Sequence, residues 1–390
     1  MKKKRISILG STGSIGVNTL NVIREFPDLF EVIGLSAGTN FELLRDQIKE
    51  FNPKIAAISS SSNVEILQDS ISPRTTKLIS GEKGLVEVAI HPDVDIVVSA
   101  VVGSVGLKPL IESIDNGKNI ALANKESMVM AGELIQEKSR EKGVMILPVD
   151  SEHNAIFQCL RGKASEDIEK IILTASGGPF RNLPLENMDS IKPQDALKHP
   201  TWDMGAKITT DSATLMNKGL ELIEAKWFFD VDRRKLDVVI HPESIIHSMV
   251  QFKNRSTIAQ MGLPDMKHPI SYALAYPDTL ESNLPALNLP DIGSLSFFEP
   301  DYEKFPCLSI AFDALDFDNS FAITLNAANE VAVQLFLEEK ISFSMIPGLI
   351  KKVLDKCDIK KIRDVDEIIE FDLLVRDRTM KLNEIKAFQT

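Results

Sequence analysis

The sequence predicts an α/β protein: an N-terminal doubly wound parallel sheet, an α+β middle domain and a C-terminal α-helical bundle. Three observations lead to this prediction. A short apolar strand near the N-terminus runs straight into a glycine-rich turn and a helix, strand and helix patterns then alternate as far as Pro148, and from Leu308 onward the apolar residues follow a helical period. The expected boundaries are 1–149, 150–283, 284–307 (a linker) and 308–390.

The composition of the sequence limits the kinds of binding partner and the cellular compartment that we expect for the protein. The 390 residues are 44% hydrophobic and 26% charged, as in an ordinary soluble globular protein. A formal net charge of −12 argues against nucleic acid or an anionic membrane as the main partner. No apolar run reaches the roughly 18 residues of a membrane span, and too few apolar residues follow Met1–Arg5 for a signal peptide. Because Cys159, Cys307 and Cys357 are few and widely spaced, we expect a reducing, cytoplasmic compartment.

The glycine-rich turn is the first candidate binding site. It follows the predicted strand Ile6–Leu9, has the sequence Gly10-Ser-Thr-Gly-Ser-Ile-Gly16 and precedes a predicted helix over Val17–Glu25. Such a turn lets backbone N–H groups approach a pyrophosphate at the helix N-terminus, although a tight turn without a ligand is the alternative. The next predicted strand, Phe30–Ser36, ends without an acid that could bind a ribose 2′-hydroxyl, which favours NADP over NAD.

The alternation that follows predicts a parallel sheet with ligands at the carboxyl ends of its strands. Ala100–Gly106 and Ala123–Glu126 lie at two such ends. Lys125 there is either a substrate contact or a charge that opens a helix. The predicted strands are Ile55–Ile58, Ile96–Val102, Asn119–Ala123 and Val144–Pro148, and the predicted helices are Asn63–Asp69, Leu107–Asn116 and Glu126–Lys142.

The stretch Asp211–Glu224, DSATLMNKGLELIE, predicts a helix that opens with a polar turn at its first two residues. Asn217, Glu221 and Glu224 would share one face of this helix, with Lys218 beside them. Two carboxylates next to a lysine suit a divalent cation and an anionic ligand together. The alternative is an amphipathic helix with a solvated charged face.

A second pair of acids follows the predicted strand that ends at Pro148. If the chain stays extended there, Asp150 and Glu152 face the same side. With Glu221 they would supply three hard oxygen ligands, which suit Mg²⁺ or Mn²⁺ better than zinc. The alternative is a helix N-cap, in which Asp150 or Ser151 opens a helix over Asn154–Leu160.

Small and polar residues suggest a phosphate site and a lid. Ser176 lies in the turn after the predicted strand Ile171–Thr174, and with Ser212, Asn217 and Lys218 it would form a nest for a phosphate monoester. The segment His199–Gly205, HPTWDMG, predicts a mobile lid whose Trp202 covers the substrate. Further predicted strands are Val238–His241, Ser248–Phe252 and Thr257–Gln260, and further predicted helices are Leu325–Glu339, Met345–Lys356, Asp364–Phe371 and Leu382–Phe388.

Taken together, several motifs resemble those of the 1-deoxy-D-xylulose 5-phosphate reductoisomerase family. They occur in order along nearly the whole chain: GSTGSIG, LANKES, PVDSEHNAIFQ, TASGGPFR, HPTWDMG, DSATLMNKGLE, HPESIIHS and LNAANEVAV. The resemblance implies a homodimeric enzyme of the non-mevalonate isoprenoid pathway, dependent on NADPH and on one divalent cation per subunit, Mg²⁺ or Mn²⁺ with Co²⁺ as a third candidate. Its substrate would be a small phosphorylated sugar, and its product 2-C-methyl-D-erythritol 4-phosphate.

The resemblance also implies roles for individual residues. The metal ligands would be Asp150, Glu152 and Glu221, with Glu224 close behind, and these three ligands and Lys125 would be catalytic. His153 matches a position at the edge of the active site. The substrate contacts would be Lys125, Ser151, Glu152, Ser176, His199, Trp202, Ser212, Asn217, Lys218 and Glu221. The cofactor contacts would be Gly10, Ser11, Thr12, Gly13, Ser14, Ile15, Gly38, Thr39, Asn40, Ala100, Asn124, Lys125, Glu126 and Gly205.

Two positions depart from the family pattern, and two other functions are compatible with these residues. Thr39 stands where many members carry a basic residue, and Glu243 stands where the family motif HPQS has glutamine. One alternative is a metal-assisted NADP dehydrogenase that acts on another phosphorylated hydroxy-ketone without rearrangement. The other is a non-catalytic dinucleotide sensor, which would need neither a carboxylate trio nor a phosphate nest.

Overall fold

The computed structural model describes residues 3–71, 75–198 and 205–387, and the chain divides into two compact units. The first unit comprises Met1–Ser127, Glu133–Asn154 and Asp265–Leu284, and the second comprises Met128–Gly132, Ala155–Pro264 and Pro285–Thr390. Each unit is therefore assembled from separate stretches of sequence. The predicted α/β class with a doubly wound sheet is confirmed.

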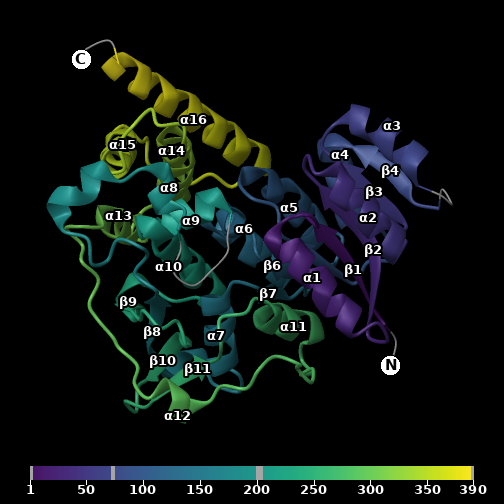
Figure 1. The fold of residues 1–390 in the computed structure, drawn as a ribbon, viewed down its shortest axis with the longest axis horizontal. Coiled ribbons are helices and arrows are strands. Elements are labelled where there is room, and N and C mark those ends of the chain that lie inside the picture. The colour runs from purple at the N-terminus through teal and green to yellow at the C-terminus, as the bar shows by residue number, and fades with distance from the viewer. Residues whose placement is uncertain (1–2, 72–74, 199–204, 388–390) are drawn as a thin grey trace. The chain divides into compact units, whose positions relative to one another are not determined.

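The first unit is built around a seven-stranded sheet with the strand order β4-β3-β2-β1-β5-β6-β7 (Figure 1). Every pairing in it is parallel. The strand order reverses at β1, because the chain adds strands on one side of β1 as far as β4 and then crosses to the other side. Doubly wound sheets bind ligands beyond the carboxyl ends of the strands at such a reversal. The strands are β1 (Lys4–Leu9), β2 (Phe30–Ala37), β3 (Ile55–Ile58), β4 (Lys77–Ser80), β5 (Ile96–Ser99), β6 (Asn119–Leu122) and β7 (Ile146–Pro148).

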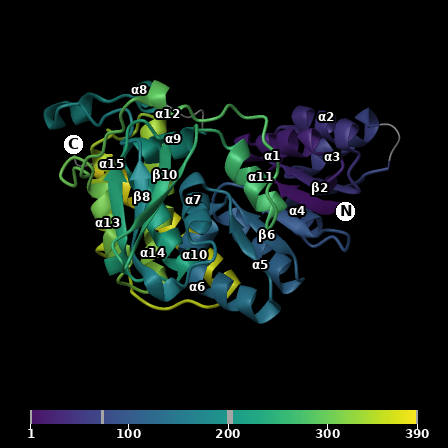
Figure 2. The same ribbon diagram turned by 90° about the horizontal axis from the view of Figure 1, so that it is seen from below.

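Helices cover both faces of this sheet (Figure 2). The right-handed crossovers expected of parallel strands place α1, α2 and α3 on one face and α4, α5 and α6 on the other. Helix α4 packs beside α5, and α11, which comes from much later in the chain, packs beside α1 and against β6 and β7. The helices are α1 (Ser14–Glu25), α2 (Phe41–Phe51), α3 (Ser61–Ser70), α4 (Gly81–Ala89), α5 (Leu107–Asp115), α6 (Lys125–Lys142) and α11 (Lys267–Ala275).

Lys4 ties α11 to the first strand. Its Nζ donates to the carbonyl oxygens of Leu274, Ala275 and Tyr276 at 2.9, 2.8 and 2.9 Å. The last carbonyls of a helix have no partner within the helix, and a cation is favourable at that end. Lys4 therefore caps α11 and links the late stretch 265–284 to the start of the chain.

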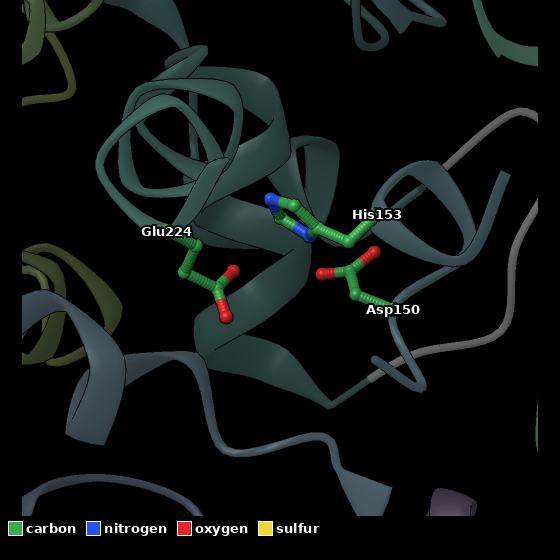
Figure 3. Close-up of side chains that lie close together, drawn as sticks. All are labelled: Asp150, His153 and Glu224. Atoms are coloured by element: carbon green, nitrogen blue, oxygen red, sulfur yellow. The ribbon is translucent and has the colours of Figure 1, made fainter. Parts of the chain in front are cut away.

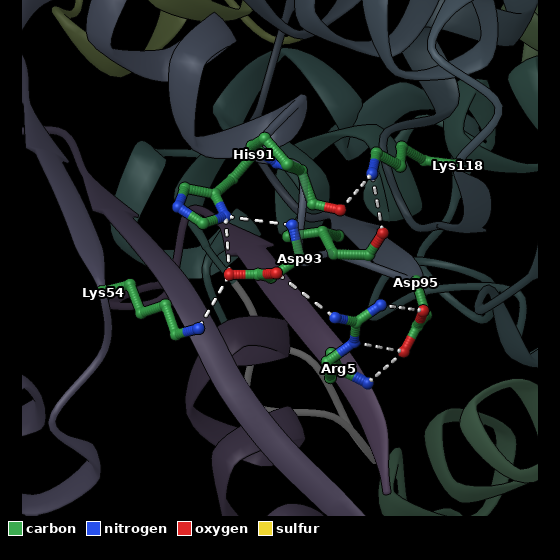
Figure 4. Close-up of polar contacts among 8 residues, drawn as sticks. Arg5, Lys54, His91, Asp93, Asp95 and Lys118 are labelled. Atoms are coloured by element: carbon green, nitrogen blue, oxygen red, sulfur yellow. Dashed lines mark hydrogen bonds and ion pairs between the residues drawn. The ribbon is translucent and has the colours of Figure 1, made fainter. Parts of the chain in front are cut away.

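Charged side chains connect the amino ends of four strands (Figure 4). Arg5 of β1 makes ion pairs with Asp95 at 2.9 Å and with Asp93 at 3.4 Å. Lys54, just before β3, pairs with Asp93 at 2.7 Å, and Lys118, just before β6, donates to a backbone carbonyl of the same loop at 2.8 Å. This amino-end network lies at the opposite end of the strands from their carboxyl ends, where doubly wound sheets bind ligands.

The second unit contains a mixed four-stranded sheet with the order β11-β10-β8-β9. Strands β8 and β9 are parallel, whereas β10 is antiparallel to both β8 and β11. In the described part of the chain β11 pairs with β10 alone, so one edge of the sheet ends in β11. The strands are β8 (Ile168–Ala175), β9 (Leu236–Ile240), β10 (Ile246–Phe252) and β11 (Thr257–Met261).

Helix α10 joins this sheet to the helical bundle, because it packs on β8 and β9 and also against α13. Helix α14 packs with α9, α13, α15 and α16. It is the one described helix long and apolar enough to cross a membrane by length and composition, but 78% of its apolar window is buried, as in the core helix of a soluble protein. The helices are α7 (Ser151–Cys159), α8 (Pro193–Ala196), α9 (Ala206–Ala213), α10 (Met216–Phe229), α12 (Leu289–Ile292), α13 (Pro306–Ala314), α14 (Asn319–Leu337), α15 (Met345–Leu354) and α16 (Val365–Ala387).

Several elements differ from the prediction. Helices α2 and α4 and strand β4 were not predicted, and the two last predicted helices form the single helix α16. The stretch Asp211–Glu224 was expected to be one helix opened by a turn, but it contains the end of α9 and the start of α10. The break falls at Leu215, whose φ of 60° lies in the left-handed region. Asp211 and Ser212 consequently lie within α9.

Candidate active site

The structure brings together the three acids predicted to bind a cation. Asp150, Glu152 and Glu221 each offer a carboxylate oxygen, and these oxygens lie within 4.8 Å of one another. Glu221 is only 1% exposed. Carboxylates this close repel one another strongly away from water unless cations neutralise them. Because all the donors are hard oxygens, the group fits Mg²⁺ or Mn²⁺.

Asp150 also belongs to a second group, with His153 and Glu224 (Figure 3). Its ligand atoms again lie within 4.8 Å of one another, and both His153 and Glu224 are buried. An imidazole nitrogen makes this group a better match for a transition metal than for Mg²⁺. The sequence had placed Glu224 close behind the ligands and His153 at the edge of the site.

The local structure around Asp150 corrects one prediction. Asp150–Glu152 is not extended, because α7 begins at Ser151. The Asp150 carbonyl accepts the N–H of Asn154 at 2.9 Å, so Asp150 is the residue that opens the helix, and the Ser151 hydroxyl donates to Glu152 at 2.6 Å. Asn154 donates from its amide to the Pro148 carbonyl at 2.8 Å, which fixes the start of α7 at the end of β7. Asp150 and Glu152 therefore belong both to the start of α7 and to the acidic group. This position is favourable because the N-terminal end of a helix stabilises negative charge.

Two buried lysines accompany these acids. Lys125, the first residue of α6, makes a 2.7 Å ion pair with Asp150. Lys218, in the first turn of α10, pairs with Glu221, to which Asn217 also donates a hydrogen bond. Both lysine side chains are about 5% exposed or less. The site therefore combines converging carboxylates with two ammonium groups, which suits a substrate that carries both a metal-chelating and an anionic end.

Ser176 and Ser212 lie on adjoining segments. Gly178 has a φ of +68°, and a Cβ built on it would lie 2.8 Å from the Ser212 carbonyl oxygen, so the turn after β8 packs directly on α9. The Gly178 N–H donates to the Ser176 hydroxyl at 3.3 Å. Asn217 and Lys218 follow in the first turn of α10.

The glycine-rich turn shows three different uses of glycine. Gly10 has a φ of +85°, and a Cβ on it would lie 2.6 Å from the Ala100 carbonyl oxygen. A Cβ on Gly16 would lie 2.3 Å from the Gly10 carbonyl oxygen. Gly13 is exposed, has an ordinary φ of −78°, and would bring its Cβ no closer than 3.4 Å to any described atom. Since the fold does not require glycine at 13, the open backbone there suits the close approach of a pyrophosphate.

A hydrogen bond joins the loop after β6 to the loop after β5. The buried Asn124 amide donates to the Gly103 carbonyl at 3.1 Å and to Glu126 at 2.9 Å, and a Cβ on Gly106 would lie 2.5 Å from the Asn124 side-chain oxygen. The Asn124 and Glu126 side chains therefore face into the loops. Asn40 likewise has a structural role, because its side chain accepts the Leu43 N–H at 3.1 Å and caps α2.

Models of a single family match most of the chain. The model described as 1-deoxy-D-xylulose 5-phosphate reductoisomerase matches residues 6–132, and models of the C-terminal domains of the same enzyme match 146–229 and 261–378. A curated relative of that name from Clostridium perfringens is 50% identical over 96% of this chain and 98% of its own length. A relative from Chlorobium phaeobacteroides is 49% identical over 96% and 98%.

The chain belongs to the 1-deoxy-D-xylulose 5-phosphate reductoisomerase family.

Solved structures of this family have the same fold. The reductoisomerase from Zymomonas mobilis in complex with NADPH is 39% identical, covers 98% of this chain and 100% of its own, and superposes with a TM-score of 0.92. A reductoisomerase in complex with NADPH, fosmidomycin and magnesium is 40% identical over 98% of this chain and 99% of its own, with a TM-score of 0.94. The family resemblance inferred from the motifs is confirmed.

Part of the predicted reductoisomerase site falls outside the described residues. His199 and Trp202 belong to this part, and their lid role stays a prediction. Gly205 is exposed and precedes the first turn of α9. Thr39, the departure at the cofactor site, is exposed as well.

Glu243, the second departure, has a structural partner in the stretch 284–307, the predicted linker. Its carboxylate lies 3.0 Å from His241 Nδ1 and accepts the Ser296 N–H at 3.2 Å. Burial alone would raise the pKa of Glu243, but hydrogen bonds from the backbone and from Ser296, together with the nearby His241, lower it below its usual value. The backbone N–H groups of Ile245 and Ile246 both donate to His241 Nε2, which leaves the Nδ1 proton for the Ser296 carbonyl at 2.9 Å. Glu243 thus contributes to holding the linker against β9.

Sequence reasoning missed two features near the site. Val102 and Val105, which follow the carboxyl end of β5, are 65% and 54% exposed, and exposed apolar side chains at such a strand end are suited to contact with a ligand. Asn329 of α14 bonds to Asp211, immediately before Ser212. Val102 was predicted to end the strand Ile96–Val102, so the sequence pointed only to Val105 as an apolar residue beyond a strand end. Nothing in the sequence pairs Asn329 with Asp211.

Proposed function

We propose the following residue roles in an enzyme that converts 1-deoxy-D-xylulose 5-phosphate into 2-C-methyl-D-erythritol 4-phosphate with NADPH and a divalent cation, in the non-mevalonate isoprenoid pathway. Asp150, Glu152 and Glu221 hold the cation. The observation that carries this role is the convergence of their carboxylate oxygens within 4.8 Å. When bound, a divalent cation polarises the carbonyl and neighbouring hydroxyl of the substrate.

Ser176, Ser212, Asn217 and Lys218 bind the phosphate of the substrate. Hydroxyl and amide groups with one ammonium are typical of phosphate sites, and the packing of Gly178 on Ser212 supports a shared pocket. Holding the phosphate keeps both parts of the substrate oriented while the carbon skeleton is rearranged. Fosmidomycin bound in a solved relative is consistent with a site for a phosphorylated substrate.

Lys125 and Ser151 lie next to the reacting oxygens of the substrate. The 2.7 Å ion pair with Lys125 fixes the position of the Asp150 carboxylate. The Ser151 hydroxyl, 2.6 Å from Glu152, orients that carboxylate. His199 and Trp202 are proposed to close over the bound substrate, on the family resemblance alone.

NADPH lies along the glycine-rich turn. The pyrophosphate meets the N-terminus of α1 at Gly13, and the edges of the cofactor site are formed by the residues after β2, β5 and β6. Residues 1–149 thus bind the cofactor, 150–283 carry the chemistry, and 284–307 link these to the helices of 308–390. The hydride passes from NADPH to the rearranged aldehyde.

The enzyme works as a cytoplasmic homodimer. Support for the dimer comes from β11, an edge strand with apolar side chains exposed at Ile258 and Met261, since such an edge is suited to pairing with a second copy. Cys159, Cys307 and Cys357 are all outside disulfides, as in a reducing compartment.

One assay tests the proposal. NADPH oxidation is followed with 1-deoxy-D-xylulose 5-phosphate in the presence of Mg²⁺ or Mn²⁺ and after removal of the metal with a chelator, and the product is identified by NMR. We expect metal-dependent turnover to the branched product. Turnover without metal would contradict the carboxylate assignment, and an unrearranged product would contradict the rearrangement.

A further inference from the structure

Asp211 is an acidic residue in the core of the second unit. It is 0% exposed and sits in α9 immediately before Ser212, a member of the proposed phosphate pocket. A buried carboxylate is costly unless it is paired and hydrogen-bonded. Asp211 has two such partners: an ion pair with Lys207 one turn earlier on α9, at 2.9 Å, and a hydrogen bond from the Asn329 amide, at 2.8 Å.

Asn329 connects α9 to the core of the bundle. It lies on α14, 118 residues further along the chain, and is itself 0% exposed. Its neighbours Ala328, Val331 and Ala332 on α14 are buried in the hydrophobic core. Cys307 of α13 is buried, and burial together with the nearby Asp211 carboxylate raises the pKa of its thiol to about 12. Asp211 is thus surrounded by residues of α13 and α14, two helices that pack in the hydrophobic core.

The position of α9 matters because the helix is short and ends at a break. It has eight residues, and Leu215 in the left-handed region separates it from α10. A small rotation of α9 would therefore move the Ser212 hydroxyl independently of Asn217 and Lys218. The Ser212 carbonyl also bears directly on Gly178, next to Ser176.

We propose that Asp211 and Asn329 are a positioning pair: their hydrogen bond holds α9 in the rotation that presents Ser212 to the substrate phosphate. The pair touches neither substrate nor cofactor and acts through Ser212. This inference rests on the proposed phosphate pocket. It extends the substrate site to α14 and gives the LNAANEVAV motif a role in substrate binding.

The test compares matched substitutions on one helix. Asn329→Asp sets a second carboxylate against Asp211. Asn326→Asp is the control, because Asn326 is equally buried on α14, one turn earlier, and also donates to a carboxylate, that of Glu330 on the same helix at 3.0 Å. We expect Asn329→Asp to raise the KM for 1-deoxy-D-xylulose 5-phosphate by about tenfold to a hundredfold. The KM for NADPH should change by less than about twofold, and Asn326→Asp should leave both values within about twofold.

A reciprocal variant separates positioning from general damage. Asp211→Asn combined with Asn329→Asp restores one amide–carboxylate hydrogen bond with its direction reversed. We expect it to recover most of the lost substrate affinity, and thermal melts monitor folding throughout. The proposal is overturned if Asn329→Asp leaves the substrate KM unchanged, if both control and test variants raise it equally, or if the reciprocal variant folds but recovers nothing. Ser212→Ala checks the pocket separately: an unchanged substrate KM there would remove the phosphate assignment itself.

Discussion

Glu221 and Glu224 lie one turn apart on α10, are equally buried, and belong to different groups of possible ligands. We expect Glu221→Gln to lower kcat at least about a hundredfold, since it removes a charged metal ligand, whereas Glu224→Gln should cost about tenfold. Titration calorimetry with Mn²⁺ measures the metal affinity of both variants, and NADPH binding should survive in each. If Glu224→Gln abolishes metal binding and Glu221→Gln does not, the group with His153 holds the metal.

Gly13 allows affinity and stability to be separated. Aspartate is a favourable residue at the start of a helix, so Gly13→Asp should leave the melting temperature unchanged or slightly higher. The added carboxylate would meet the pyrophosphate, and we expect the KM for NADPH to rise at least about tenfold. Gly10→Ala is the control: its φ of +85° and the 2.6 Å approach to Ala100 should make it destabilising. Unimpaired NADPH binding by a folded Gly13→Asp enzyme would place the pyrophosphate elsewhere.

At the scale of single residues, the sequence predicted correctly which acids come together, but not the backbone conformation that brings them together. Asp150, Glu152 and Glu221 converge as expected, although through a helix start and not through an extended segment. The break at Leu215 could not have been predicted, because a branched side chain rarely adopts a left-handed φ and only the surrounding packing maintains it.

At the scale of elements, the amino-end network should make the parallel sheet sensitive to acid. The Asp93 N–H donates to His91 Nδ1 at 3.2 Å, and burial, with Lys54 and Lys118 nearby, lowers the His91 pKa from 6.5 despite the opposing effect of Asp93. Protonation of His91 is therefore easier in the unfolded chain. The stability it contributes is present above pH 6.5 and is lost as the pH falls through that value towards the lower pKa of the folded state.

We therefore expect the melting temperature to fall as the pH is lowered from about 7.5 to about 5.5, and to fall less in His91→Gln. Differential scanning calorimetry at a series of pH values measures this. His268 also has a pKa lowered by burial, so His268→Gln serves as the comparison that apportions the effect. Parallel pH profiles for the wild type and His91→Gln would show that His91 contributes nothing.

The elements missed from the sequence share physical causes. Helix α4 contains Gly81 and Gly84, which argue against a helix, yet a Cβ on Gly84 would lie 3.1 Å from Ala57, so this glycine allows the helix to pack closely on β3. Strand β4 has only four residues, none of them buried. Both elements form because of tertiary packing, which the local sequence pattern does not indicate. The long periodic segment of α14 was correctly predicted as a helix over Leu325–Glu339, although the helix itself spans Asn319–Leu337 and begins earlier.

At the scale of the whole molecule, the edge strand β11 provides the test of assembly. Ile258→Lys places a charge on an edge that we propose pairs with a second copy, and we expect a monomer in analytical ultracentrifugation. Leu373→Lys on α16 is the control, since Leu373 is also an exposed apolar residue, and this variant should remain dimeric. A dimeric Ile258→Lys enzyme would remove β11 from the interface, and a monomeric Leu373→Lys enzyme would point to α16.

The return of α11 to the first sheet has a consequence for biosynthesis. A ribosome must make residues 155–264 before it supplies the helix that covers β6 and β7 and that Lys4 caps. Until then, the surface of α1, β6 and β7 against which α11 packs stays uncovered on the nascent chain. The protein therefore cannot mature strictly from its amino end forward: the unit that contains the parallel sheet reaches its finished form only after about half of the other unit has been translated.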